Sequence, residues 1–215
     1  TPENEHSELS DLDIRTAGDC STDDEHAERV TRLLCGSNGV AKGIHSAYVY
    51  HTALTSSFIP AMNWFLDNLC FVINASLVFP SNAGKYSWAS AFMDFQVRYN
   101  RVIFCICAGN EGANTNHYVT PPGTAYNAIT VANSTKDAYI RNKSSYEVEK
   151  ELKMNKPTIA APGTGVIADK NNMLLAWTSF ATPIVTGIVI KLLEEAPALQ
   201  LFPEAVSAIL IASAT

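Results

Sequence analysis

The sequence has little charge, few cysteines and no long apolar run. Only 17% of its 215 residues are charged, and the net charge of −6 argues against a nucleic-acid-binding surface, which is normally basic. No uncharged apolar stretch reaches about 18 residues, so the sequence predicts no membrane span. No internal repeat or low-complexity tract interrupts the chain. These properties suit a single domain over residues 1–215.

The cysteines form no recognisable framework. Five is an odd number, and no Cys-x-x-Cys pair occurs that would indicate a structural zinc site. Buried thiols in a reducing compartment explain them best, which favours a cytoplasmic location. Acidic residues gather at the start, with ten Asp or Glu among residues 1–30. A solvated loop is the simplest interpretation, and a site for a metal ion or a basic substrate stretch is the alternative.

Apolar runs alternate with helical segments along the chain. The patterns predict strands over 47–51, 70–77, 102–107, 128–132 and 158–161, and helices over 26–36, 57–68, 88–99, 179–195 and 203–212. Strands that are apolar on both faces and alternate with helices indicate a mostly parallel sheet covered on both sides. The predicted fold class is therefore α/β, a doubly wound three-layer sandwich.

Three polar residues fall where such sheets bind ligands, beyond the carboxyl ends of strands. Ser179 begins a helix, whose free N–H groups and dipole stabilise a developing negative charge, although a helix-capping serine is the alternative. Asn110 lies between glycines and can donate to an oxyanion, or serve only the turn. Ser76 follows a third strand. His26 begins another helix and can remove a proton from a serine, although a lone histidine is more often structural.

Four segments together resemble the subtilisin-like serine peptidases in order and approximate spacing. They are His26-Ala-Glu-Arg-Val, Ser76-Leu-Val, Ala-Gly-Asn110-Glu-Gly and Thr-Ser179-Phe-Ala-Thr-Pro, and the resemblance extends over essentially the whole chain. It implies a serine endopeptidase with Ser179 as nucleophile, His26 as general base and Asn110 in the oxyanion hole. It also implies a peptide or protein substrate that contacts Ser76, Leu77, Val78, Gly109, Trp177 and Thr178. The chemistry would need no cofactor; structural calcium is common in the family, but the sequence shows no ligand set.

The family's catalytic Asp is not evident in this sequence. Asp13 lies only 13 residues before His26, and no apolar strand leads into it. His6-Ser-Glu-Leu9 resembles the stretch that follows the catalytic Asp in the family, which places that Asp upstream of Thr1. We therefore expect the first strand with its Asp, and further strands after Thr215, to lie outside this sequence. A separate N-terminal polypeptide is one source of the missing piece.

Two substitutions leave a second function open. Trp177 and Val78 stand where the family has glycines beside the substrate groove, and their bulk is expected to narrow or occlude it. A pseudopeptidase that binds a peptide or protein partner without cutting it is the alternative to the endopeptidase. An unrelated α/β hydrolase is disfavoured, because Ser179 lacks a Gly-x-Ser-x-Gly elbow and no histidine follows it.

Overall fold

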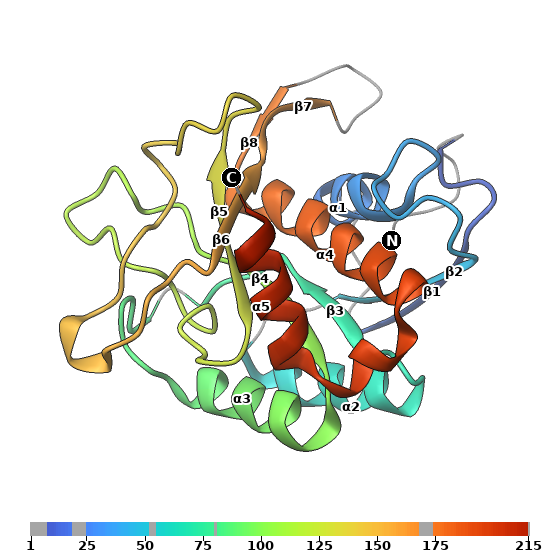
Figure 1. Ribbon diagram of the computed structural model, residues 1–215, viewed down its shortest axis with the longest axis horizontal. Helices are drawn as coiled ribbons and strands as arrows, with labels where there is room; N and C mark the ends of the chain where they lie inside the picture. Colours follow the sequence, from blue (N-terminus) through green and yellow to red (C-terminus); the bar gives the residue numbers. More distant parts are fainter. Residues whose placement is uncertain (1–7, 19–24, 52–54, 80, 168–173, 215) are drawn as a thin grey trace.

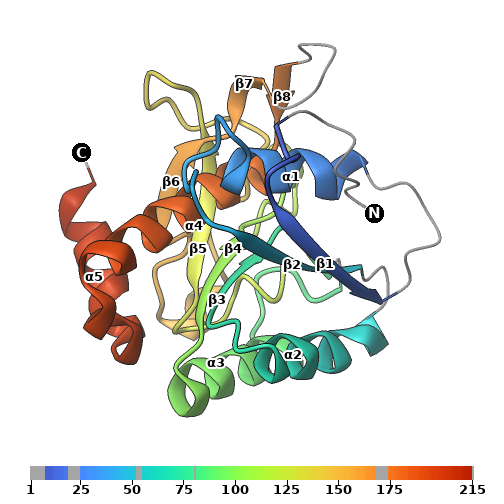
Figure 2. The same ribbon diagram turned by 90° about the vertical axis from the view of Figure 1, so that its right-hand side faces the viewer.

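A computed structural model describes residues 8–18, 25–51, 55–79, 81–167 and 174–214. Its centre is a parallel sheet with the strand order β3-β4-β5-β6. The strands are β3 (Val72–Ala75), β4 (Ile103–Cys107), β5 (Ile129–Ser134) and β6 (Ile159–Pro162). Helices lie on both faces of this sheet (Figures 1 and 2), so the predicted three-layer α/β class is confirmed.

The helices form two layers, one on each face of the central sheet. On one face lie α2 (Phe58–Asp67) and α3 (Trp88–Asn100), and on the other lie α1 (Glu25–Cys35), α4 (Thr178–Glu195) and α5 (Pro203–Ser213). The central strand β4 is buried along its whole length. Its side chains alternate between the layers: Phe104 and Ile106 pack with α2 and α3, whereas Ile103 and Cys105 pack with α4 and α5.

Two smaller sheets flank the central one. β1 (Asp13–Gly18) and β2 (Ser46–His51) form a parallel pair, with Asp13 opposite Ser46 and Gly18 opposite His51. β7 (Thr164–Ile167) and β8 (Leu174–Ala176) form an antiparallel pair. Within the described ranges, β2 pairs only with β1, and β3 pairs only with β4. The sheet is thus divided between β2 and β3.

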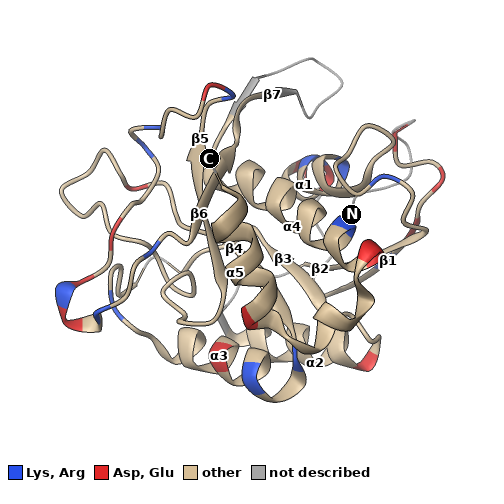
Figure 3. Cartoon of the chain, in the orientation of Figure 1, with Lys and Arg blue, Asp and Glu red and all other residues tan. Residues whose placement is uncertain are grey.

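Ten elements lie close to their predicted ranges, and three strands were missed. Strand β1 has the sequence DIRTAG and is exposed or only half-buried along its length, so it lacks the apolar signal of the central strands. The pair β7 and β8 was also not predicted. Charged residues are sparse on the central strands and common on the outer loops (Figure 3). None of the described helices is long and apolar enough to cross a membrane.

Candidate active site

Ser179 is the second residue of α4, and it lies beside the carboxyl end of β3. The preceding Trp177 is extended, with φ −138° and ψ 156°, so the helix starts abruptly at Thr178. The first N–H groups of a helix have no partner inside it, and they point out of its N-terminus. A negative charge that develops beside Ser179 therefore meets N–H donors and the positive end of the α4 dipole.

Pro183 explains why the Ser179 carbonyl can accept a hydrogen bond from a residue outside α4. Proline has no N–H, so the carbonyl four residues earlier loses its helical partner. The Ser76 hydroxyl replaces it and donates to the Ser179 oxygen at 2.8 Å. A serine at the end of β3 thereby fixes the peptide of the candidate nucleophile.

Two further hydrogen bonds hold Ser76 itself. The Asn74 Nδ2 atom donates to the Ser76 hydroxyl at 2.9 Å, and the Thr186 hydroxyl donates to Asn74 Oδ1 at 3.0 Å. The polar chain therefore leaves α4 at Thr186, crosses β3 and returns to α4 at Ser179. Sequence analysis selected Ser76 and quoted Pro183 within its motif, but it foresaw no role for Pro183, Asn74 or Thr186, because these roles depend on two segments that meet only in the fold.

Asn110 follows β4 and is oriented by the start of α4. Its Oδ1 atom accepts from both the backbone N–H and the hydroxyl of Thr178, each at 3.0 Å. Because a backbone N–H can only donate, the atom that it meets must be the amide oxygen. The Nδ2 donor is consequently left on the outer side of the amide, where it suits an oxyanion.

Gly109 has a backbone that only glycine fits. Its φ is +102°, and a Cβ atom there would lie 2.6 Å from the Thr120 hydroxyl. Its carbonyl accepts from the Ser145 N–H at 3.0 Å. The turn before Asn110 is therefore packed on one side, and a larger residue would displace the amide.

His26 is exposed and lies in the first turn of α1, which packs along α4. Its ring centroid is 5.6 Å from that of Phe180, the residue after Ser179. The structure thus brings His26, Asn110 and Ser179 to one end of the fold, from α1, the loop after β4 and α4. Their catalytic roles remain predictions of the sequence.

The residues expected to line a substrate groove surround this point. The Leu77 carbonyl accepts from the Cys107 thiol at 3.3 Å, and Thr178 is fully buried. Val78 is half-buried. Trp177 keeps 41% of its surface exposed, and the Lys143 ammonium lies 5.1 Å from the centre of its ring. The indole is therefore held toward the Lys143 loop by a cation–π contact.

The described cysteines are thiols set in apolar surroundings. Burial raises the pKa of Cys35, Cys105 and Cys107 to about 12, and it also raises the pKa of Cys70. A thiol with such a pKa is not a nucleophile at neutral pH. The described part of the chain brings no three His, Cys, Asp or Glu residues together as a metal site.

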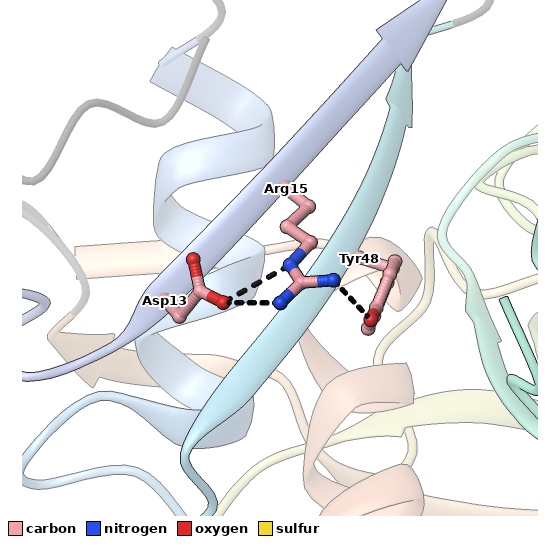
Figure 4. A network of polar contacts seen from close by, with 3 residues as sticks. All are labelled: Asp13, Arg15 and Tyr48. Carbon is pink, nitrogen blue, oxygen red and sulfur yellow. Dashed lines mark hydrogen bonds and ion pairs between the residues drawn. The ribbon is translucent and has the colours of Figure 1, made fainter.

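Asp13 forms its polar contacts in a part of the fold away from Ser179, the candidate nucleophile. Its carboxylate binds the Arg15 guanidinium at 3.0 Å, and Arg15 also donates to the Tyr48 hydroxyl at 3.1 Å (Figure 4). Asp13 begins β1 opposite the first residue of β2, so it lies at the amino end of this sheet. The carboxyl ends of parallel strands carry the site, which argues against Asp13 as the partner of His26.

Part of the acidic N-terminal segment has structural partners. Glu8 binds Arg32 at 2.9 Å, and the Arg32 side chain is only 5% exposed. Glu25 binds Arg29 at 2.7 Å within α1. The prediction of a purely solvated segment is therefore wrong for Glu8, whereas Glu25 keeps 71% of its side chain exposed. Residues 1–7 and 19–24, which hold five of the acids, lie outside the described ranges.

A serine at a helix N-terminus, with an oriented amide and an imidazole on a neighbouring helix, is the arrangement found in serine hydrolases that use a histidine base. The sequence profile of the subtilase family matches residues 10–215, so this chain belongs to the subtilase family.

Known relatives agree with this assignment. An alkaline proteinase of Hapsidospora chrysogena is 29% identical over 181 residues, which make up 78% of this chain and 42% of the relative. The chain thus spans less than half the length of that curated relative.

Solved structures share the fold. The prenylagaramide maturation protease PagA has a TM-score of 0.79 at 23% identity, covering 99% of this chain and 79% of that one. A cold-adapted subtilisin-like serine proteinase has a TM-score of 0.74, also at 23% identity, with 97% and 77% covered.

Proposed function

We propose that this chain is the catalytic core of a serine endopeptidase that hydrolyses peptide bonds through an acyl-enzyme on Ser179. The observation that carries the proposal is the bonding of Asn110 to Thr178. This contact couples a side-chain amide to the first N–H groups of α4, beside the hydroxyl of Ser179. Because an asparagine oxygen can also cap a helix, the proposal rests on this bond together with His26 beside Phe180 and the match to the subtilase family.

The geometry supports the following division of roles. Ser179 Oγ attacks the scissile carbonyl while His26 removes its proton, and the electron pair moves onto the carbonyl oxygen. Asn110 Nδ2 and the Ser179 backbone N–H donate to that oxyanion. His26 then gives its proton to the leaving amine, and water hydrolyses the ester by the same steps in reverse. An acidic residue from outside the described ranges would orient His26.

The substrate backbone would lie along Ser76, Leu77 and Val78 on one side. Residues at the end of a strand can pair with an extended peptide, which is a common mode of peptide recognition. Gly109 and Thr178 are buried, so they would act on the substrate only through Asn110 and Ser179, and Trp177 would limit the groove near Lys143. Trp177 and Val78 narrow the substrate groove. The peptidase should therefore prefer substrates whose side chains beside these two residues are small or extended.

Hydrolysis of a quenched fluorescent peptide library tests the proposal. Cleavage should be abolished by Ser179→Ala and by His26→Ala. His45→Ala is the matched control, since His45 is also an exposed histidine but lies outside the site, and it should keep full activity. The library should be tested both with this chain and with the longest natural form of the protein.

A pseudopeptidase is the competing function, favoured by Trp177 and Val78 in the groove. It predicts that library peptides bind but remain intact, with equal affinity in the native protein and in Ser179→Ala. That result in the folded, longest natural form would overturn the peptidase proposal.

A further inference from the structure

The loop that follows β5, residues 135–143, carries positive charge on a chain that is acidic as a whole. It holds Lys136, Arg141 and Lys143 against one acid, Asp137, whereas the net charge of the chain is −6. All three basic residues are exposed, and none of the ion pairs within the described ranges involves them. Blue segments mark this loop beside β5 in Figure 3. We refer to residues 135–143 as the basic loop.

The end of the basic loop is anchored on both sides of Asn110. The Gly112 N–H donates to the Lys143 carbonyl at 2.9 Å. The Ser145 N–H donates to the Gly109 carbonyl at 3.0 Å. The loop is therefore fixed to the candidate oxyanion residue by backbone hydrogen bonds, which leave the basic side chains available for another partner.

Lys143 extends toward the start of α4. Its ammonium lies 5.1 Å from the centre of the Trp177 ring, and Trp177 immediately precedes Thr178 and Ser179. The Trp177 carbonyl accepts from the Phe180 N–H at 3.0 Å, so its backbone is fixed to the first turn of the helix. An ammonium has three donors, so it can rest on an indole and still donate to a carboxylate. A positive charge is thus held beside the candidate nucleophile.

The strand order places the basic loop opposite the Ser76 side of the site. Ser76 follows β3, Asn110 follows β4 and the basic loop follows β5, and these strands are parallel neighbours in that order. Their carboxyl ends lie about 5 Å apart along one edge of the sheet. A peptide that runs along residues 76–78 and has its scissile carbonyl at Asn110 therefore continues past the basic loop.

Exposed apolar side chains accompany the charges. Tyr139 is 74% exposed, Ile140 is 55% exposed and Trp177 is 41% exposed. A surface that combines cations with aromatic and aliphatic groups suits a peptide with both acidic and apolar side chains. The net charge of −6 argues against a nucleic acid as the partner.

Two acidic residues reduce the positive charge of this region without cancelling it. Asp137 belongs to the basic loop, and Glu111 follows Asn110 and bonds the Asn114 amide. Over residues 109–112 and 135–143 together, three basic residues face two acidic ones. The excess is positive, and it includes the Lys143 ammonium on Trp177.

We propose that the basic loop recognises acidic side chains of a peptide substrate, on the side of the scissile bond that faces away from residues 76–78. The inference rests on the proposed function and names the class of its substrate: a peptide with Asp or Glu within about three residues of the scissile bond on that side. Lys143 pairs with a carboxylate beside Trp177, and Arg141 and Lys136 extend the positive surface. Such complementarity selects partners and speeds their association.

Matched peptides test the charge preference. Each quenched fluorescent peptide carries Glu at one position within three residues of the scissile bond, on either side, and its partner carries Gln there. At low ionic strength Glu should raise kcat/KM at least about 5-fold over Gln on one side of the bond and not on the other. About 0.5 M sodium chloride should remove most of this preference, because the charges are exposed.

Substitutions of Lys143 connect the preference to the loop. Lys143→Gln should bring the Glu-to-Gln ratio of kcat/KM close to 1, and Lys143→Glu should make the enzyme prefer Lys over Glu at the same peptide position. Lys150→Gln is the matched control and should keep the native ratio, since Lys150 is also exposed but lies in η2 (Lys150–Leu152). Each ratio compares two peptides on one protein, so a general loss of activity cancels.

Binding to Ser179→Ala measures recognition without chemistry. Fluorescence anisotropy of the labelled Glu and Gln peptides should give Kd values that differ at least about 5-fold in the longest natural form. The difference should disappear in the double variant Ser179→Ala, Lys143→Gln.

The outcomes separate the two proposals. A Glu preference in both binding and hydrolysis supports the basic loop and the peptidase. A Glu preference in binding without any hydrolysis supports the basic loop and contradicts only the peptidase. Equal treatment of Glu and Gln, a preference unchanged by Lys143→Gln, or no binding of any peptide overturns the basic loop as a recognition surface. Faster hydrolysis of both peptides by Lys143→Gln also overturns it, in favour of an acidic segment of the chain itself as the occupant.

Discussion

The two sheets of this molecule differ in how completely they are built. The central sheet β3–β6 is buried between helical layers and carries Ser179 and Asn110 on a network of short hydrogen bonds. The pair β1–β2 is mostly half-exposed, and His26 lies on the helix beside it. The candidate nucleophile and oxyanion donor are thus held by hydrogen bonds on the complete half, while the candidate base lies on the half beyond the division between β2 and β3.

Hydrogen exchange should show the largest difference between the two sheets. Amides of β4 and β5 should exchange only on global unfolding, and those of β1 and β2 at least about 10³-fold faster, because few buried apolar contacts hold that pair. Native-state exchange followed by mass spectrometry measures both regions in one experiment. Equal protection in the two sheets would show that the division between β2 and β3 has no energetic consequence.

Asn110→Ala should reduce peptide hydrolysis by about 10²- to 10³-fold, the loss known for the oxyanion asparagine of subtilisin itself. Asn110→Asp should be at least as harmful, although its carboxylate can still accept from Thr178. Asn114→Ala is the control, since Asn114 is an exposed residue of the same loop that bonds Glu111. A rate unchanged in Asn110→Ala would exclude the amide from the site.

Lys156 should make the free energy of unfolding depend on pH. Its ammonium donates to the Ala128 carbonyl at 2.6 Å, and burial lowers its pKa from 10.5 to about 8. The unfolded chain then binds more protons than the folded one between about pH 8 and 10.5. The free energy of unfolding should therefore rise with pH across this window, by up to about 3 kcal/mol.

Comparison with Lys156→Met isolates this contribution. The free energy of unfolding should be measured with denaturant at a series of pH values. From pH 8 to 10.5 it should rise more in the native protein than in Lys156→Met. A constant difference would mean that the Lys156 pKa is the same in both states.

Arg15→Ala should have the smallest effect, although Arg15 belongs to a visible polar network. Arg15 and Asp13 are more than half exposed, and exposed ion pairs contribute about 0–1 kcal/mol. Thermal unfolding should shift by no more than a few degrees. A larger loss would indicate that β1 and β2 depend on this cluster for their pairing.

The sequence predicted the helices and strands that can be recognised from a short stretch of chain. Strands such as β4 are apolar on both faces, and helices such as α4 begin at recognisable residues, so both were placed within a few residues. β1 was missed because four of its six residues are exposed and its partner β2 lies 33 positions away. Polarity along such a strand is indistinguishable from that of a loop.

The sequence allowed residues of the candidate site to be selected by their type and motif. It did not show which contacts these residues make. Ser76, Asn110 and Ser179 were selected from motifs, yet the role of Pro183 in freeing the Ser179 carbonyl required the fold. The orientation of the Asn110 amide likewise depends on Thr178, which is distant in sequence. The direction of Trp177 could not be foreseen, because it follows from a contact with Lys143.

Covalent labelling by a fluorophosphonate tests the central claim most directly, since it requires an activated serine but no knowledge of the substrate. The adduct should map to Ser179 by mass spectrometry in the longest natural form, and it should disappear in His26→Ala while persisting in His45→Ala. An unlabelled Ser179 in the folded natural form would contradict the account.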